Sequence, residues 1–324
     1  MTNIINYTLN ELVDKIKSKE ISSKELTSAY IERSKSSKKL NVYIEETFDD
    51  ALKNSEKFDA NPNFDKKLAG IPFAVKDLFC TKNVKTTAGS KILENFVPAY
   101  ESTVTQNLWD AGAILLGKLN CDEFAMGSSN ETSFFGNVIS PIDDNLVPGG
   151  SSGGSASALA AKLTPATIGT DTGGSIRQPA SFTGTVGLKP TYGSCSRYGI
   201  VAFASSLDQA GPMTRDVKDC ALMLEVISSF DPKDSTSIKF KRPNYFSDLN
   251  KNIKGKKIGI PKEYRVDGMP TEIENLWEKG KSYLKDCGAE IIDISLPHTN
   301  YALPTYYIVA PAEAFMYNSR LLKN

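Results

Sequence analysis

Two stretches rich in glycine and serine lie in the middle of the sequence and restrict how this chain can fold. The first covers residues 149–155 (GGSSGGS), and the second covers residues 169–177 (GTDTGGSIR). An alanine-rich segment that ends at Lys162 separates them, and the apolar residues 166–168 precede the second stretch. Short apolar runs that alternate with helical segments are typical of layered α/β folds. We therefore expect an α/β fold.

Local patterns predict several elements of such a fold. Thr8 with Glu11, and Ser22 with Glu25, have the spacing of capping boxes and predict two helix starts near the N-terminus. Apolar runs predict short strands, and capped periodic segments predict helices. The predicted strands are 70–75, 113–118, 257–261 and 290–295, and the predicted helices farther along the chain are 102–111 and 271–285.

We expect one domain over residues 1–324. It would consist of a helical N-terminal region (1–60), a catalytic core (65–228), a polar connection (229–256), a further β-α-β region (257–314) and a divergent tail (315–324).

The charge balance argues against direct binding of nucleic acid. The chain has 38 Lys and Arg residues and 38 Asp and Glu residues, so its formal net charge is zero. Proteins that bind nucleic acid directly gain most of their affinity from a surplus of basic residues. Contact with RNA would therefore need a local patch or a partner subunit.

The counts of histidine and cysteine exclude several kinds of site. His298 is the single histidine, so zinc or iron sites with several His ligands cannot be built, and we expect no metal in this chain. The five cysteines contain no C-x-x-C pair and favour free thiols, with Cys80 and Cys121 as small buried residues. The N-terminus does not resemble a signal peptide, and the apolar runs are too short to span a bilayer. We expect a cytoplasmic protein, or one in an organellar matrix, without membrane contact.

Three functions could explain the glycine and serine stretches. A phosphate-binding P-loop would need lysine where Ser155 stands. A nucleophile elbow, G-x-S-x-G, is matched by residues 149–153, with His298 downstream, but a polar segment ending in Pro148 precedes it where a buried strand is needed. The signal for either function is weak.

The third interpretation is a serine nucleophile with a lysine base. Ser175 follows Thr172, Gly173 and Gly174, whose backbone N–H groups could form an oxyanion hole. A buried, neutral lysine can remove the proton from serine, and a second serine can relay that proton.

Three segments together resemble the amidase signature family. They are 70–77 (GIPFAVKD), 149–155 and 169–180 (GTDTGGSIRQPA). The resemblance implies an α/β fold with a mixed central sheet that helices cover on both faces. It also implies a triad in which Ser175 is the nucleophile, Ser151 the bridging serine after a cis peptide bond, and Lys76 the general base. Arg177 would support the Ser175 loop.

Further motifs resemble one branch of that family, the glutaminase subunits of tRNA-dependent amidotransferases. They are 122–132 (DEFAMGSSNET), 188–193 (LKPTYG), 202–209 (AFASSLDQ) and 303–314 (LPTYYIVAPAEA). This resemblance implies that Met126, Gly127 and Ser128 bind the substrate. Tyr306 or Tyr307 could line a glutamine pocket or pack in the core.

The same resemblance implies a ligase reaction in protein biosynthesis. L-Glutamine would be hydrolysed through a glutamyl-enzyme, and the ammonia would convert Glu-tRNA(Gln) to Gln-tRNA(Gln). The chain would act in a heterotrimer with amidotransferase B and C subunits, and the partner would bind most of the tRNA. ATP and Mg²⁺ would be used by the partner, so no cofactor is expected in this chain. The alternatives are an independent amidase that acts on another small amide, and an inactive chain that retains only partner contacts.

The resemblance ends close to the C-terminus. Residues 315–324 do not follow these glutaminase subunits, whose sequences continue well beyond this point. We expect that the chain lacks a C-terminal segment of the fold. In the family, that segment supplies the residues that hold the α-amino and α-carboxylate groups of glutamine.

Overall fold

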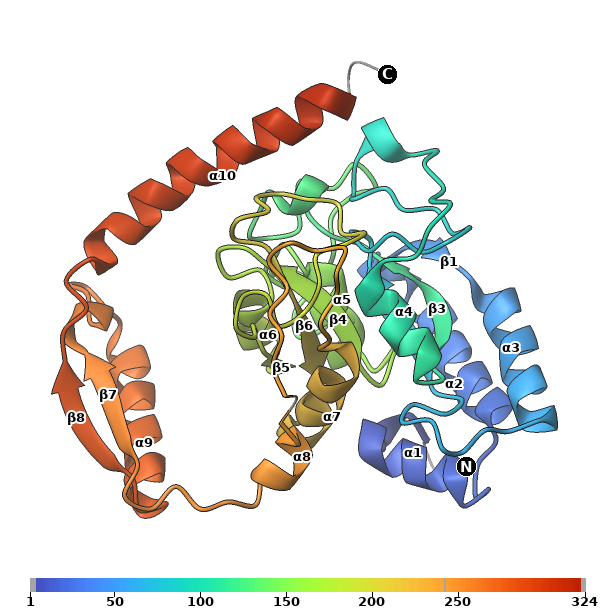
Figure 1. Cartoon of the computed structure of the whole chain (residues 1–324), viewed down its shortest axis with the longest axis horizontal. Coiled ribbons are helices and arrows are strands. Elements are labelled where there is room, and N and C mark those ends of the chain that lie inside the picture. The colour runs from blue at the N-terminus through green and yellow to red at the C-terminus, as the bar shows by residue number, and fades with distance from the viewer. Residues whose placement is uncertain (1–3, 242, 322–324) are drawn as a thin grey trace. The chain divides into compact units, whose positions relative to one another are not determined.

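The computed structural model describes residues 4–241 and 243–321, which form two compact units (Figure 1). The larger unit contains the chain up to Tyr245 and again from Glu313, and the smaller unit contains Phe246–Ala312. That the whole chain forms one domain stays a prediction.

A mixed six-stranded sheet lies at the centre of the larger unit, counted over the described residues. Its strands are β1 (Tyr43–Glu46), β2 (Pro72–Lys76), β3 (Ile114–Leu119), β4 (Thr167–Asp171), β5 (Val186–Gly187) and β6 (Gln209–Thr214). They are ordered β1-β3-β2-β4-β6-β5. Strands β3, β2 and β4 are parallel, whereas β1, β6 and β5 each run antiparallel to the neighbour they pair with. The α/β fold with a mixed sheet is confirmed, and β2 and β3 match the predicted strands 70–75 and 113–118.

Helices pack against this sheet. Every residue of β2, β4 and β6 is buried, which requires cover on both faces because neighbouring side chains of a strand point in opposite directions. Helix α2 contacts β2, α3 contacts β3, α5 contacts β2 and β4, and α7 contacts β6. The helices of this unit are α1 (Leu9–Lys17), α2 (Ser23–Ser36), α3 (Phe48–Ala60), α4 (Thr103–Asp110), α5 (Gly153–Ala160), α6 (Arg177–Thr183) and α7 (Val217–Ile227).

The predicted start of α1 is confirmed in full, and that of α2 in part. The Thr8 side chain accepts the Glu11 N–H while the Glu11 carboxylate accepts the Thr8 N–H, which completes a capping box. At α2, the Ser22 hydroxyl accepts the Glu25 N–H. Helix α4 likewise matches the predicted helix 102–111.

The smaller unit is built around a β-α-β arrangement. Strands β7 (Lys257–Pro261) and β8 (Glu290–Ile294) are parallel, and α9 (Thr271–Asp286) connects them. These elements confirm the predicted strands and helix of this region. The short helix α8 (Tyr245–Asp248) precedes them and α10 (Thr299–Leu321) follows them; α8 begins with the last residue of the larger unit before the boundary, and α10 from Glu313 on belongs to the larger unit. None of the helices in the described parts of the chain has the length and apolar character that crossing a membrane requires.

Candidate active site

The sheet places the predicted catalytic segments at one edge. Lys76 is the last residue of β2 and Asp171 is the last residue of the adjacent parallel strand β4. Ser151 stands two residues before α5, and Ser175 lies in the loop between β4 and α6. In α/β sheets, ligands bind outside the carboxyl ends of parallel strands. The fold therefore gathers these residues where a substrate can reach them.

The Lys76 amine lies among three hydroxyl groups. Its Nζ is 2.8 Å from Ser151 Oγ, 2.9 Å from Ser152 Oγ and 2.8 Å from Thr170 Oγ1. The Lys76 side chain is fully buried and has no ion-pair partner among the described residues. The structure thus joins Lys76 to Ser151, as the sequence predicts.

Burial strongly changes the acid-base character of this lysine. Loss of water around the amine disfavours its charged form and lowers the pKa of Lys76 to about 8. The nearby groups Cys121, Asp122, Asp208 and Asp171 act in the opposite direction and limit the shift. A large fraction of Lys76 is therefore neutral at slightly alkaline pH, which a general base requires.

Ser151 is held in a closely packed segment. The peptide bond between Gly150 and Ser151 is cis, as the family resemblance implied. The Ser151 carbonyl accepts the Asp122 N–H at 3.3 Å. A Cβ atom on Gly150 would lie 2.1 Å from Asp122 Oδ2, so only glycine fits beside this carboxylate.

Ser175 lies beside the segment that contains Ser151 and Ser152, and it is the most exposed of the three predicted triad residues. Its carbonyl accepts the Ser152 N–H at 3.2 Å, which joins the two loops. Ser175 is 8% exposed, whereas Lys76 and Ser151 are fully buried. No hydrogen bond links the Ser175 hydroxyl to another group in the described part of the chain. The structure therefore brings the Ser175 loop to the Lys76–Ser151 pair without showing the last link of a triad.

The loop after β4 presents unpaired backbone amides. Within residues 4–241 and 243–321, the N–H groups of Thr172, Gly173 and Ser175 donate to no acceptor. The Gly174 N–H was also predicted for the oxyanion hole, but it donates to Asp171 Oδ1 at 2.9 Å because the loop turns back onto that carboxylate. This geometry leaves Thr172 and Gly173, of the three predicted amides, for a developing oxyanion.

Asp171 organises the far end of this loop, the end that leads into α6. Its carboxylate also accepts the Ile176 N–H at 3.1 Å and is bound by the Arg177 guanidinium at 2.9 and 3.0 Å. Burial alone would raise the pKa of Asp171, but the hydrogen bonds and charge of Arg177 and the loop amides outweigh it and lower that pKa. The predicted supporting role of Arg177 is confirmed, and it acts through Asp171.

The predicted substrate-binding residues follow a buried carboxylate. Met126 and Ser128 are exposed, and a Cβ atom on Gly127 would lie 2.2 Å from the Asp122 carboxyl carbon. Asp122 accepts the N–H of Asn130 at 3.0 Å and thereby fixes the loop that carries these residues. Their contact with a substrate stays a prediction.

Other residues singled out in the sequence lie in the smaller unit. His298 is exposed, and the rings of Tyr306 and Tyr307 contact each other with centroids 5.5 Å apart. A place for either tyrosine in a glutamine pocket stays a prediction. Cys80 and Cys121, in the larger unit, are buried as predicted, and burial raises the pKa of Cys121 to about 12. Over the described residues, no group of His, Cys, Asp and Glu side chains is arranged to hold a metal ion.

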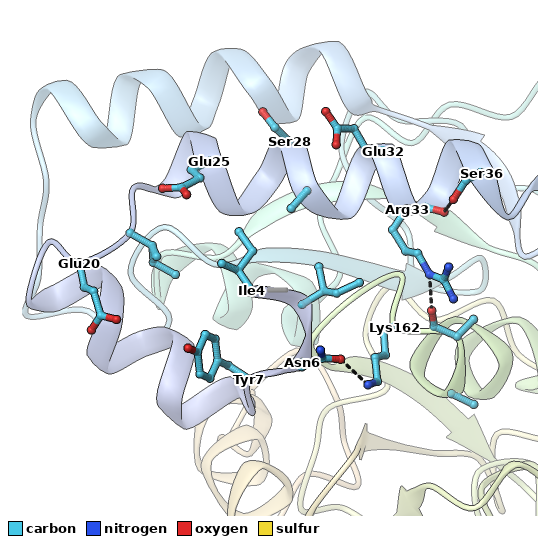
Figure 2. A pocket seen from close by; sticks show the side chains of 15 residues that line it. Ile4, Asn6, Tyr7, Glu20, Glu25, Ser28, Glu32, Arg33, Ser36 and Lys162 are labelled. Carbon is cyan, nitrogen blue, oxygen red and sulfur yellow. Dashed lines mark hydrogen bonds between the residues drawn. The ribbon is translucent and has the colours of Figure 1, made fainter. Parts of the chain in front are cut away.

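A surface cavity of about 1150 Å³ lies at the C-terminal end of α5, the end farther from Ser151 (Figure 2). The last residue of that helix and the two that follow it, residues 160–162, form part of the cavity lining, together with residues of α2 and of the segment before α1. Figure 2 shows hydrogen bonds from Arg33 to the Ala161 carbonyl and from Lys162 to Asn6 at this end. Ser151 lies at the opposite end of α5, about 12 Å away along the helix axis. The cavity is therefore separate from the candidate active site.

Three groups of this site are not evident from the sequence. Ser152 and Thr170 complete the surroundings of Lys76, and Asp171 shapes the nucleophile loop. All three lie inside or beside the glycine and serine stretches, but a single sequence does not tell which hydroxyls point toward the lysine. Only the pairing of β2 with β4 brings Thr170 within reach of Lys76.

Comparison with known proteins places this geometry in a family. The sequence model of the Amidase family matches residues 25–324, which includes the segment 315–324 that we expected to diverge. The chain is 77% identical over 314 residues to the A subunit of glutamyl-tRNA(Gln) amidotransferase from Pelagibacter ubique (strain HTCC1062), and 60% identical over 321 residues to the corresponding protein of Zymomonas mobilis. Both alignments cover 97% of this chain, which spans 65% of the length of each relative.

Solved structures of the same fold come from more than one kind of amidase. The crystal structure of the glutamyl-tRNA(Gln) amidotransferase A subunit from Thermotoga maritima superposes with a TM-score of 0.85 at 37% identity, covering 99% of this chain and 68% of that one. The peptide amidase from Stenotrophomonas maltophilia superposes with a TM-score of 0.88 at 32% identity, covering 98% of this chain and 68% of that one. From the family match, the relatives and these structures, we conclude that the chain belongs to the amidase family.

Proposed function

We propose that the chain hydrolyses an amide with Ser175 as nucleophile, Ser151 as proton relay and Lys76 as general base. The observation that carries this proposal is the fully buried Lys76 amine at hydrogen-bond distance from Ser151, with a pKa lowered to about 8 by loss of water. An exposed lysine would keep its proton at neutral pH and could not serve as a base.

The hydrogen bonds around Lys76 suggest a direction for the proton. A neutral amine donates two hydrogen bonds and accepts one, and Lys76 has three hydroxyl neighbours. The Ser152 hydroxyl donates to the Thr170 carbonyl at 3.3 Å, so Ser152 can only accept from Lys76. We assign the hydroxyl that donates to the Lys76 lone pair to Ser151, because the segment that contains Ser151 is joined to the Ser175 loop.

The reaction follows from this arrangement. Ser175 Oγ attacks the amide carbonyl, its proton moves to Ser151, and the Ser151 proton moves to Lys76. The amides of Thr172 and Gly173 stabilise the oxyanion of the tetrahedral intermediate. Return of the proton along the same path to the nitrogen breaks the C–N bond and releases ammonia. Water then attacks the acyl-enzyme and its proton moves to Lys76; return of that proton through Ser151 to Ser175 Oγ breaks the ester bond and yields the carboxylic acid, free Ser175 and neutral Lys76.

We further propose that the amide is the side chain of L-glutamine and that the ammonia serves tRNA-dependent amidation by a partner. The support for this substrate is the 77% identity to the A subunit of a glutamyl-tRNA(Gln) amidotransferase. In such an assembly B and C subunits would complete the enzyme, and the partner would use ATP and Mg²⁺ and bind Glu-tRNA(Gln). We place the reaction in the cytoplasm, in keeping with five cysteines that form no disulfide among the described residues.

The test is ammonia release from glutamine by the 324-residue chain, alone and with the B and C subunits of a close relative. We expect release in the assembled complex and an increase when Glu-tRNA(Gln) and ATP are present. The same assay with Ser175→Ala gives the background. An assembled complex that releases no more ammonia than this background would contradict the proposal.

A second candidate is an amidase that acts without partners. The superposition with a peptide amidase at a TM-score of 0.88 supports it, because that fold neighbour is at least as similar in structure as the amidotransferase protein from Thermotoga maritima. Hydrolysis of simple amides or peptide amides by the chain alone, without use of glutamine, would favour this candidate. A chain that binds the partners but hydrolyses no amide would favour the inactive alternative.

A further inference from the structure

Asp208 contacts the oxyanion loop from the neighbouring strand. Strands β4 and β6 pair antiparallel with Asp171 opposite Gln209, so the next positions, Thr172 and Asp208, face each other just beyond the sheet. The Thr172 hydroxyl donates to Asp208 Oδ1 at 2.5 Å. Asp208 is 5% exposed, and a short hydrogen bond to a buried carboxylate is among the stronger contacts that a hydroxyl can make.

The Asp208 carboxylate is itself rigidly held. It accepts the Phe203 N–H at 2.9 Å and the Ala204 N–H at 3.1 Å, which closes the turn 203–208. The Asp208 N–H in turn donates to the Ala204 carbonyl at 2.8 Å. Because the carboxylate cannot rotate without breaking these bonds, it is a fixed point against which Thr172 can be aligned.

Two carboxylates thus hold the two ends of one loop. Asp171 holds its far end through Gly174, Ile176 and Arg177, and Asp208 holds its near end through Thr172. The amides that the mechanism uses, those of Thr172 and Gly173, lie between these fixed points.

We propose that Asp208 is a positioning residue for the oxyanion site, which fixes Thr172 so that the Thr172 and Gly173 amides are aligned before reaction. This inference rests on the proposed amide hydrolysis. An oxyanion exists only in the transition state and the tetrahedral intermediate, so a loosened loop slows the reaction without weakening substrate binding.

The test uses three variants in the assembled complex with glutamine as substrate. Thr172→Val removes the hydroxyl with little change of shape, Asp208→Asn removes the charge, and Thr172→Ser keeps the hydroxyl. Because the Asp208 charge also raises the pKa of Lys76, kcat is compared at the alkaline plateau of each pH profile, where Lys76 is neutral in every variant. We expect the first two to lower kcat about 10- to 100-fold with KM within about twofold. Thr172→Ser should retain most of kcat. The double variant of Thr172→Val and Asp208→Asn should be no slower than the slower single variant, because both substitutions remove the same hydrogen bond.

A second readout reports on the aligned amides directly. A boronic acid analogue of glutamine forms a tetrahedral adduct with the serine hydroxyl, and its boron-bound oxygen takes the place of the oxyanion. Its affinity should fall in Thr172→Val by the same factor as kcat, whereas a role in folding alone would leave this affinity unchanged in the folded protein.

The control is Thr183→Val in α6, where the Thr183 hydroxyl donates to the Pro179 carbonyl at 2.9 Å outside the site. It loses the same kind of buried hydroxyl and should keep kcat. Wild-type kcat in folded Thr172→Val would overturn the proposal even if Asp208→Asn fails to fold. If the wild-type protein does not hydrolyse glutamine, the proposed function fails separately. The comparison then uses the rate at which a fluorophosphonate labels Ser175 in place of kcat. During that labelling the phosphoryl oxygen becomes more negative and occupies the place of the oxyanion.

Discussion

Lys76 is fully buried and has the hydroxyls of Ser151, Ser152 and Thr170 within 2.9 Å of its amine. These surroundings explain how a chain with one histidine could carry out acid-base chemistry. Loss of water lowers the pKa of Lys76, and the hydroxyls supply hydrogen-bond partners without the negative charge that would restore the proton. A carboxylate in place of one of these hydroxyls would favour the charged form.

The proposed reaction should depend on pH through this residue. Because the pKa of Lys76 is lowered to about 8, the neutral base is the minor form below that pH and the major form above it. We expect kcat/KM for glutamine to fall about tenfold per pH unit below pH 8 and to level off above it. A profile that is flat between pH 6 and pH 9 would show that Lys76 is not the base.

The triad candidates could be predicted from the sequence because their motifs have characteristic spacing. Lys76, Ser151 and Ser175 each lie in a motif, and the structure brings their segments together. Which backbone N–H groups of the Ser175 loop are free to bind an oxyanion could not be predicted in the same way. The use of the Gly174 N–H by Asp171 depends on the loop conformation, which no pattern of residue types specifies.

Between elements, a buried ion pair connects β3 to the segment that follows β2. Lys118 Nζ lies 3.2 Å from Asp77 Oδ1, both side chains are fully buried, and the amine also donates to the Phe79 carbonyl and to Thr86 at 2.7 Å. Burial raises the pKa of Asp77, and the Lys118 charge opposes that shift.

Breaking this pair should cost much more than breaking an exposed one. Lys118→Met leaves the Asp77 carboxylate buried without a counter-charge, and we expect a loss of about 3–5 kcal/mol in the free energy of unfolding. Lys85→Met breaks the partly exposed pair with Glu45 and should cost less than about 1 kcal/mol. Denaturant unfolding of both variants measures the difference, and equal losses would contradict it.

The junction before α5 depends on the absence of a side chain at Gly150. A methyl group there would lie 2.1 Å from Asp122 Oδ2, so Gly150→Ala must displace that carboxylate or the Ser151 segment. We expect a loss of about 1–3 kcal/mol in unfolding free energy, together with most of the activity.

The matched control for this glycine lies in α9. Gly280 is exposed, and a Cβ atom there would contact nothing within 4 Å. Gly280→Ala should leave activity unchanged and stabilise the helix by up to about 1 kcal/mol, because alanine is the better helix former. Equal stability of the two variants in thermal unfolding would show that space around Gly150 is not limiting.

Elements with strong local signals were predicted well, and those that depend on distant contacts were not. Strand β3 and helix α9 follow from apolar runs and periodicity. Strand β6 has the sequence QAGPMT, which contains glycine, proline and two polar residues, and it forms because β4 and β5 pair with it on either side. Helix α10 contains Pro304 and Pro311, which argue locally against a helix.

Considered as a whole molecule, the chain spans 65% of the length of its curated relatives and has a helix with much apolar surface. Large apolar side chains along α10 are 62% to 76% exposed: Tyr301, Leu303, Tyr307, Ile308 and Phe315. Exposed apolar side chains concentrated on one helix promote association in water.

We expect this helix to make the isolated chain self-associate. The sedimentation coefficient should rise with protein concentration, and Leu303→Lys with Ile308→Lys should reduce the rise, because two charges must then be desolvated on association. Glu272→Lys, at an exposed position of α9, raises the net charge by the same two units and is the control for added charge. Equal concentration dependence in all three proteins would exclude α10 as the cause.

The most direct test of the central claim is to locate the acyl group during turnover. The assembled protein is mixed with glutamine, quenched in acid within the first turnovers and digested, and the peptides are analysed by mass spectrometry. The mechanism predicts a γ-glutamyl ester on Ser175 that is absent in Ser175→Ala and forms at least about 10³-fold more slowly in Lys76→Met. Ammonia release that persists undiminished in Ser175→Ala, or an acyl group on another residue, would contradict it.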